Sequence, residues 1–214
     1  MTLGEPVCIF LLNIRHRMAS PAPLKSPNLQ PDDWILAAFA RLSAEGIDAV
    51  RIEVLARELR VSKGSFYWHF QDREELVEKM LGRWEAEEFG WLDSISAAGH
   101  GPAARWARFV ERYSEPDRAR LLVGIHSWAR RDAAIAARIT ALEARRARFI
   151  GEVLADIGLS RAAADSWSEI AQYAWLGWLD RATREAALPS GGRSLADVLS
   201  ELIRAASSQS AAPR

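Results

Sequence analysis

Hydrophobic residues recur with helical spacing along most of the chain. In the first such segment, four apolar residues lie one, three or four positions apart and so line one face of a helix: Ile35, Leu36, Phe39 and Leu42. Pro31, followed by two aspartates, suits the start of this helix, and Gly46 suits its end. No segment of comparable length alternates apolar and polar residues, so the pattern predicts an all-α fold.

Two short helices joined by a tight turn are predicted next. The first covers about residues 52–59, and the second covers about residues 63–69 after Ser62, a favourable N-cap residue. Asp72 and Glu75 then have the spacing of a capping box, which predicts a longer helix ending near residue 90.

Glycine, proline and serine residues divide the rest of the chain into further helices. Breaks are predicted at 99–102, 115–117, 158–160 and 187–194. The helix at about 161–186 is followed by a last one, 195–206, whose apolar residues form one stripe.

The N-terminal segment has a different character. The apolar run 7–14 is too short to span a bilayer, and only Glu5 is charged before it, whereas a signal peptide begins with positive charge. Residues 1–17 are therefore an extension before an internal start at Met18, a hydrophobic arm or a signal segment. We favour the first interpretation and expect residues 1–17 to be dispensable.

Composition narrows the function classes. Of 214 residues, 28 are Lys or Arg and 28 are Asp or Glu, so the chain has no net charge and any nucleic-acid binding must come from a local patch. The single cysteine, Cys8, excludes an intrachain disulfide and favours a reducing, cytoplasmic location. We expect no membrane association.

Residues 51–76 carry the most informative pattern. Two short helices around a tight turn are typical of a helix-turn-helix, whose second helix enters the major groove of DNA. Phe66 and Phe70 share one face of the second helix and should anchor it to the core. The other positions include side chains that donate hydrogen bonds to phosphates or bases, and no acid lies between residues 60 and 71.

This segment resembles the tetracycline-repressor (TetR) family of transcriptional regulators. The resemblance spans about residues 33–80 and is carried by residues 55–56, 61–65, 66–70 and 72–76. It implies an N-terminal three-helix helix-turn-helix DNA-binding domain at 28–78, preceded by an arm at 1–27. A larger helical ligand-binding and dimerisation domain at 79–214 is implied to follow.

The resemblance also implies DNA contacts at individual positions. Base or nearby backbone contacts are implied for Lys63, Gly64 and Tyr67, and phosphate contacts are implied for Ser65, Trp68, His69 and Arg73.

Two further positions depart from the family's usual residues, and a third has two possible roles. Arg51 stands where family members usually cap the first of the two helices with Thr or Ser, and Arg60 stands where they usually have Gly in the turn. Both changes add positive charge beside DNA. Glu53 either accepts a hydrogen bond from a cytosine amino group or faces solvent, and we favour solvent.

The C-terminal half contains no catalytic pattern, and we expect neither an enzyme, a cofactor nor a metal site. The family resemblance implies an inducer pocket, and the density of Trp and Tyr predicts that the inducer is small and hydrophobic or aromatic. The candidate lining residues are Trp84, Trp106, Phe109, Tyr113, His126, Trp128 and Trp175. Aromatic residues at helical spacing are also typical of an ordinary core. The arginine runs 130–131 and 145–148 are interpreted as solvated helix faces, with a site for a ligand's anionic group as the alternative.

The last two helices are predicted to form a homodimer interface. The candidate residues are Tyr173, Ala174, Gly177, Trp178, Arg181, Leu195, Val198, Leu199 and Leu202. Symmetry would then present two recognition helices to a palindromic operator on double-stranded DNA. The sequence therefore predicts a repressor that an inducer releases from its operator, with a regulator or activator that has no small-molecule inducer as the alternative.

Overall fold

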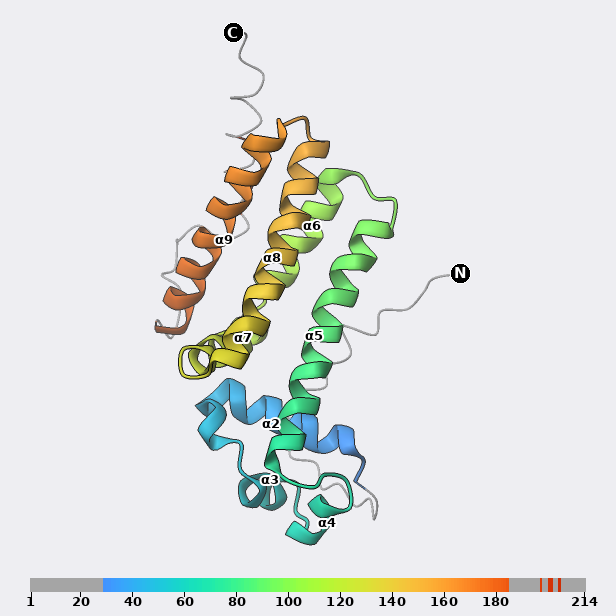
Figure 1. Cartoon of the computed structure of the whole chain (residues 1–214), viewed down its shortest axis with the longest axis vertical. Helices are drawn as coiled ribbons and strands as arrows, with labels where there is room; N and C mark the ends of the chain where they lie inside the picture. The colour runs from blue at the N-terminus through green and yellow to red at the C-terminus, as the bar shows by residue number, and fades with distance from the viewer. Residues whose placement is uncertain (1–28, 185–196, 198–199, 202–203, 205–214) are drawn as a thin grey trace. The chain divides into compact units, whose positions relative to one another are not determined.

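A computed structural model of the chain describes residues 29–184 and residues 197, 200, 201 and 204. The described residues form helices without any strand (Figure 1), which confirms the predicted all-α class. In chain order, the elements are α2 (Pro31–Glu45), the 3₁₀ helix η1 (Ile47–Ala49), α3 (Ile52–Glu58), α4 (Lys63–Tyr67), α5 (Arg73–Ala97), α6 (Pro102–Tyr113), α7 (Pro116–Ala129), α8 (Ala133–Asp156) and α9 (Arg161–Arg184).

Local chemistry accounts for several helix ends. The carboxylate of Asp33 accepts a hydrogen bond from the backbone amide of Gln30 at 2.8 Å, at the start of α2. That helix ends at Gly46, whose positive φ of 85° suits a residue without a side chain. At the start of α5, the Asp72 carboxylate accepts a hydrogen bond from the Glu75 amide at 2.8 Å, as the predicted capping spacing requires.

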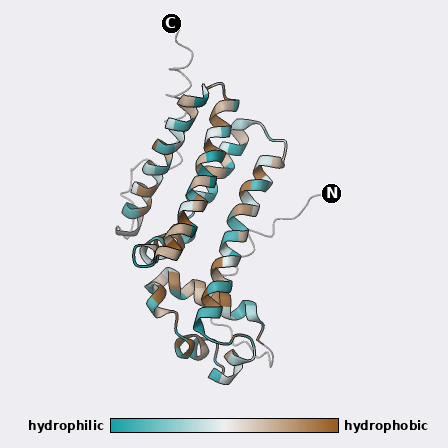
Figure 2. Cartoon of the chain, viewed as in Figure 1, coloured by the Kyte–Doolittle hydropathy of each residue, from teal (hydrophilic) through white to brown (hydrophobic). Residues whose placement is uncertain are grey.

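Helix α5 continues to Ala97, beyond the predicted end near residue 90. Gly90 does not stop it, because Leu92 and Ile95 continue the buried stripe of the helix. Figure 2 shows hydrophobic and hydrophilic residues interleaved along the described helices, as expected when each helix buries one face.

The described residues group into two compact units. The first contains residues 29–88 and 120–135, and the second contains residues 89–119 and 136–184. The sequence-based division instead places one boundary at residue 78. Residues 120–135 join the first unit through close packing: a Cβ at Gly124 would lie only 2.7 Å from the backbone oxygen of Leu42 in α2.

Aromatic residues form much of the core of each unit. In the first unit, Trp34, Phe39, Phe66 and Phe70 are buried together with aliphatic residues of α2, α3 and α5. In the second unit, buried aromatic residues come from α6, α8 and α9: Trp106, Phe109, Tyr113, Phe149 and Trp175.

Some predictions lie outside the described residues. These are the arm at 1–27, the loop at 187–194 and the interface residues Leu195, Val198, Leu199 and Leu202. Of the predicted last helix, residues 197, 200, 201 and 204 are described, and all four are helical. No helix among the described residues is long and apolar enough to cross a membrane.

Candidate nucleic-acid interface

Helices α3 and α4 form a helix-turn-helix. The turn between them contains Arg60, whose φ of 58° is a left-handed conformation that is unfavourable for a residue with a Cβ. The amide of Val61 donates to the backbone oxygen of Ala56 at 2.9 Å, which closes the turn. A tight turn is therefore formed at the position where the family resemblance implies glycine.

Two phenylalanines anchor α4 to the core of the first unit, as their spacing predicts. The rings of Phe66 and Phe70 stack at 5.2 Å between centroids, and the ring of Phe66 also meets Trp34 of α2 edge-on at 5.2 Å. Phe66 and Phe70 are almost completely buried. This packing fixes the rotation of α4 about its own axis and so determines which side chains face outward.

The outward face of α4 exposes two large aromatic side chains. Tyr67 is 58% exposed and Trp68, directly after the helix, is 87% exposed. Lys63 and Gly64 are also exposed, while Ser65 and His69 are half-buried. Exposed rings of this size on a short helix are available for contact with another molecule.

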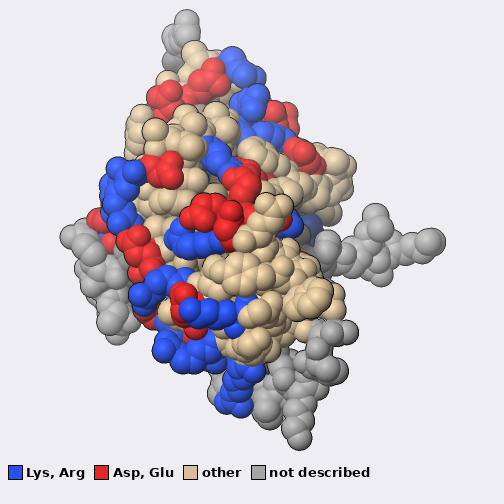
Figure 3. Space-filling model, turned by 60° about the horizontal axis from the view of Figure 1, so that its bottom comes forward, with Lys and Arg blue, Asp and Glu red and all other residues tan. Residues whose placement is uncertain are grey.

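Exposed basic side chains outnumber the exposed acidic ones, Glu53 and Glu58, beside this face. Arg51, Arg57 and Arg60 are exposed in or beside the helix-turn-helix. In Figure 3, which brings the helix-turn-helix forward, Lys and Arg predominate over Asp and Glu toward the lower edge of the view. A neutral chain therefore carries a local cationic surface that can approach phosphates.

Lys63 does not point freely into solvent. Its ammonium nitrogen lies 2.7 Å from Oε1 of Glu53, which is in the first turn of α3. The hydrogen bond from Lys63 lowers the pKa of the Glu53 carboxyl below its ordinary value, and the charge of Lys63 adds to the effect. The Glu53 side chain is 61% exposed, as expected, and it is also paired with the first residue of α4.

Arg73 has a structural contact that the sequence does not reveal. Its Nε donates to the backbone oxygen of Val50 at 2.6 Å, and Nη2 donates to that of Ile47 at 2.9 Å. The side chain thus binds the backbone oxygens of the first residue of η1 and of the residue that follows η1, and it ties α5 to the entry of the helix-turn-helix. Its implied contact with phosphate stays a prediction.

Neither N-cap residue of the two short helices makes a capping hydrogen bond, which differs from the expectation for Ser62 but is expected for Arg51. Ser62 occupies the N-cap of α4, but its side chain makes no capping hydrogen bond. Arg51 occupies the N-cap of α3 and, having no side-chain acceptor, makes none either. The short helices are therefore held by their buried faces, which is how most helical stability arises in proteins.

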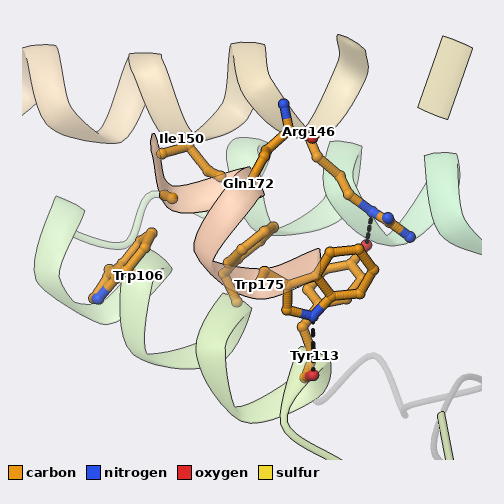
Figure 4. A pocket seen from close by; sticks show the side chains of 8 residues that line it. Trp106, Tyr113, Arg146, Ile150, Gln172 and Trp175 are labelled. Atoms are coloured by element: carbon orange, nitrogen blue, oxygen red, sulfur yellow. Dashed lines mark hydrogen bonds between the residues drawn. The ribbon is translucent and has the colours of Figure 1, made fainter. Parts of the chain in front are cut away.

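The second unit contains a small cavity of about 10 Å³, enough for roughly one water molecule. Its lining comes from α6, α8 and α9 and consists of Trp106, Phe109, Tyr113, Arg146, Ile150, Ala171, Gln172 and Trp175. In Figure 4, Tyr113 receives two hydrogen bonds: its hydroxyl from Nε of Arg146 at 3.0 Å and its backbone oxygen from Trp175 at 3.4 Å.

Four of the predicted pocket residues line this cavity: Trp106, Phe109, Tyr113 and Trp175. The other three, Trp84, His126 and Trp128, do not line it, because they belong to the first compact unit.

Arg146 corrects a prediction, because the arginine run 145–148 is not a fully solvated face. Arg146 is only 3% exposed, and its guanidinium lies 4.5 Å from the ring centre of Tyr113 and 4.9 Å from that of Trp175. Arginine repeats on a helix do not reveal which member turns inward, so the sequence missed it.

Helix α9 has an exposed face with apolar members. Tyr173 is 69% exposed and Ile170 is 43% exposed. Gly177 and Arg181 follow Tyr173 at helical spacing and are exposed too, while Ala174 and Trp178 are half-buried. Large exposed apolar side chains on one helix are typical of an interaction surface.

Comparisons with known proteins agree with this geometry. Residues 35–80 match the family model of bacterial regulatory proteins of the tetR family. The fold resembles a transcriptional regulator from Rhodococcus (TM-score 0.62, 16% identity, 85% of this chain and 94% of that one). It also resembles a TetR transcription regulator from Haloarcula marismortui (0.57, 14%, 84% and 93%) and a protein assigned to that family from Mesorhizobium loti (0.56, 20%, 84% and 92%). A search of curated proteins finds no significant match.

Proposed function

We propose that this chain is a transcriptional repressor that binds a palindromic operator as a homodimer. The proposal proceeds from the match of residues 35–80 to the tetR family of bacterial regulatory proteins. The observation that carries the proposal is the outward face of α4. Buried Phe66 and Phe70 hold the helix, while Lys63, Tyr67 and Trp68 project from it. In a helix-turn-helix, residues near the start of the second helix reach base edges in the major groove.

Selection of bound DNA from a random pool tests this proposal directly. We expect a palindromic motif whose half-sites are about one helical turn apart or a multiple of it. Tyr67→Ala should weaken binding to the selected operator about 5- to 100-fold and binding to random DNA much less, as for a lost base contact. Enrichment of no motif would contradict operator recognition.

The exposed face of α9 supports the homodimer. A Cβ at Gly177 meets nothing within 4 Å in the protomer, and the same is true at exposed Gly90 of α5. Gly177→Trp should therefore leave the protomer folded but weaken dimerisation and operator binding, whereas Gly90→Trp serves as the matched control. Sedimentation at micromolar concentration measures the effect, and a stable wild-type monomer would contradict the proposal.

We further propose that a small hydrophobic or aromatic inducer enters the second unit beside Trp106, Tyr113 and Trp175. The cavity of about 10 Å³ holds no such molecule as it stands, so binding must displace side chains. An inducer should change tryptophan fluorescence and release operator DNA, and Trp106→Leu should alter both responses. Release by small, highly charged metabolites alone would contradict this chemistry.

The small volume of the cavity also favours a second candidate, a regulator or activator that takes no small-molecule inducer. The two candidates differ in one result. If a diverse set of hydrophobic compounds neither stabilises the protein against heat nor changes its operator affinity, the regulator without an inducer is the better account.

A further inference from the structure

The ion pair between Glu53 and Lys63 joins the two helices of the helix-turn-helix on its exposed side. Glu53 lies in the first turn of α3, and Lys63 is the first residue of α4, ten positions later. Their side chains are 61% and 55% exposed, and Nζ lies 2.7 Å from Oε1. The pair therefore stands at the end of α4 that, in a helix-turn-helix, faces base edges.

Each partner keeps hydrogen-bonding capacity after the pair has formed. The Lys63 ammonium has three N–H donors and uses one for Glu53, and the Glu53 carboxylate has a second oxygen and further lone pairs that can accept. The hydrogen bond from Lys63 keeps the pKa of Glu53 low, so that the carboxylate is ionised at neutral pH. The pair thus presents a donor and an acceptor side by side.

A G·C base pair presents the complementary groups in the major groove. Guanine offers the acceptors O6 and N7, and cytosine offers the N4 amino donor. O6 and N4 are hydrogen-bonded to each other, at a separation of about 2.9 Å. The Nζ···Oε1 distance of 2.7 Å is close to this separation, so that a donor opposite O6 and an acceptor opposite N4 can be placed together.

Resting on the proposed operator binding, we propose that Glu53 and Lys63 together read one G·C base pair in each half-site, Lys63 at guanine and Glu53 at the cytosine amino group. This makes Glu53 a specificity-determining residue. Its pairing with Lys63 also restrains a long, flexible side chain before DNA arrives, which lowers the entropy lost on binding.

An A·T pair also places a donor beside an acceptor, but it fits less well. Lys63 would then face thymine, which has one acceptor, O4, next to a methyl group, whereas guanine offers two acceptors to one ammonium. Phosphate binding fits poorly too, because the Glu53 carboxylate would repel a phosphate that approaches Lys63. The chemistry therefore favours a G·C pair whose guanine faces Lys63 and whose cytosine faces Glu53.

The test is DNA selection from a random pool with the full chain, followed by affinity measurement on the selected operator with each base pair substituted in turn. The wild type should require G·C at one position of each half-site, with a loss of about 5- to 100-fold for the other pairs. Glu53→Ala should reduce the G·C preference at that position to the part that Lys63 supplies at guanine, and it should leave the other positions unchanged. Glu53→Gln, which keeps an acceptor oxygen, should reduce that preference less than Glu53→Ala does.

Glu45→Ala is the matched control, because it removes the same charge from an exposed ion pair, that with Arg41 of α2. It should not change the motif. A G·C preference that is undiminished in Glu53→Ala, or a wild-type preference for A·T at the affected position, overturns the inference while operator binding stands. If the wild type selects no motif at all, the proposed operator binding fails as well, so the two failures are distinguishable.

Discussion

The helix-turn-helix and the aromatic cluster of the second unit use similar residue types in opposite ways. In the helix-turn-helix, aromatic residues divide by face: Phe66 is buried and Trp68 is exposed two positions later. In the second unit, both the aromatic rings of Tyr113 and Trp175 and the charged Arg146 are buried. A surface that binds a partner must expose its polar and aromatic side chains, whereas the second unit buries them. Truncation of an exposed side chain should therefore change binding, and truncation of a buried one should change stability.

The largest expected effect tests the division of faces on α4. Phe66→Ala should lower the free energy of unfolding by about 3–5 kcal/mol, because it removes a fully buried ring packed on Trp34 and Phe70. Tyr67→Ala, its neighbour, should change stability much less while weakening operator binding. Urea denaturation and operator titration of both variants measure this. The opposite pattern would mean that α4 is rotated by about half a turn.

A smaller effect is expected inside the second unit. Tyr113→Phe removes the hydroxyl that accepts a hydrogen bond from Nε of Arg146, in a buried setting. Loss of an acceptor for a charged donor should lower the free energy of unfolding by about 1.5–3 kcal/mol. Operator affinity of the folded protein should stay unchanged in the absence of any inducer. Equal stability of the variant and the wild type would show that another group replaces the hydroxyl.

Replacing Arg60 in the turn of the helix-turn-helix should change stability and DNA binding in opposite directions. Arg60→Gly relieves the left-handed backbone strain and should raise the free energy of unfolding by up to about 1 kcal/mol. It also removes a cation, so that the salt dependence of DNA binding should fall by about one unit of slope if Arg60 meets a phosphate.

Arg60→Ala is the control for that experiment, because it removes the charge but keeps a Cβ at positive φ. It should reproduce the loss of salt dependence without the gain in stability. If both variants bind random and operator DNA with wild-type salt dependence, the Arg60 side chain makes no contact with phosphate.

The smallest effect concerns the start of α5. The backbone amide of Gln71 donates to the Glu75 carboxylate and, with help from Lys79, holds the pKa of Glu75 below its ordinary value. A depressed folded-state pKa contributes stability above the ordinary pKa of about 4.3, which is lost as pH falls toward the folded-state pKa. The stability difference between the wild type and Glu75→Gln should therefore shrink as the pH falls from about 4.3 through the lower, folded-state pKa of Glu75. A constant difference from pH 7 to pH 3 would contradict it.

The sequence indicates features that depend on local spacing. The helix-turn-helix, the buried phenylalanines and the cap at Asp72 follow from residues within four or five positions of each other. Contacts between helices were missed: Arg73 binds carbonyls more than twenty residues earlier, and Lys63 pairs with Glu53 across a turn. Such contacts depend on how helices are placed in space, which hydrophobic periodicity does not specify.

The sequence predicts only half of the residues that line the cavity, for the same reason. The aromatic residues that line it are visible as large apolar side chains on helices, but Arg146, Ile150, Ala171 and Gln172 have no distinguishing local pattern. Conversely, Trp84 is an aromatic of the same kind that serves as core of the other unit. Residue type alone does not separate a pocket from a core.

The close packing of Gly124 on Leu42 has a consequence for the order in which the chain folds. The first unit is discontinuous, because residues 120–135 complete it; Arg131 also pairs with Asp48 at 2.8 Å, across 83 positions. During synthesis, the segment 29–88 emerges well before residues 120–135, so the first unit cannot complete its core until those residues have been made. Contacts of such long sequence separation slow folding, since a long loop must close before they form. A fragment cut after residue 88 would contain the whole helix-turn-helix yet lack α7, which packs on α2 through Gly124.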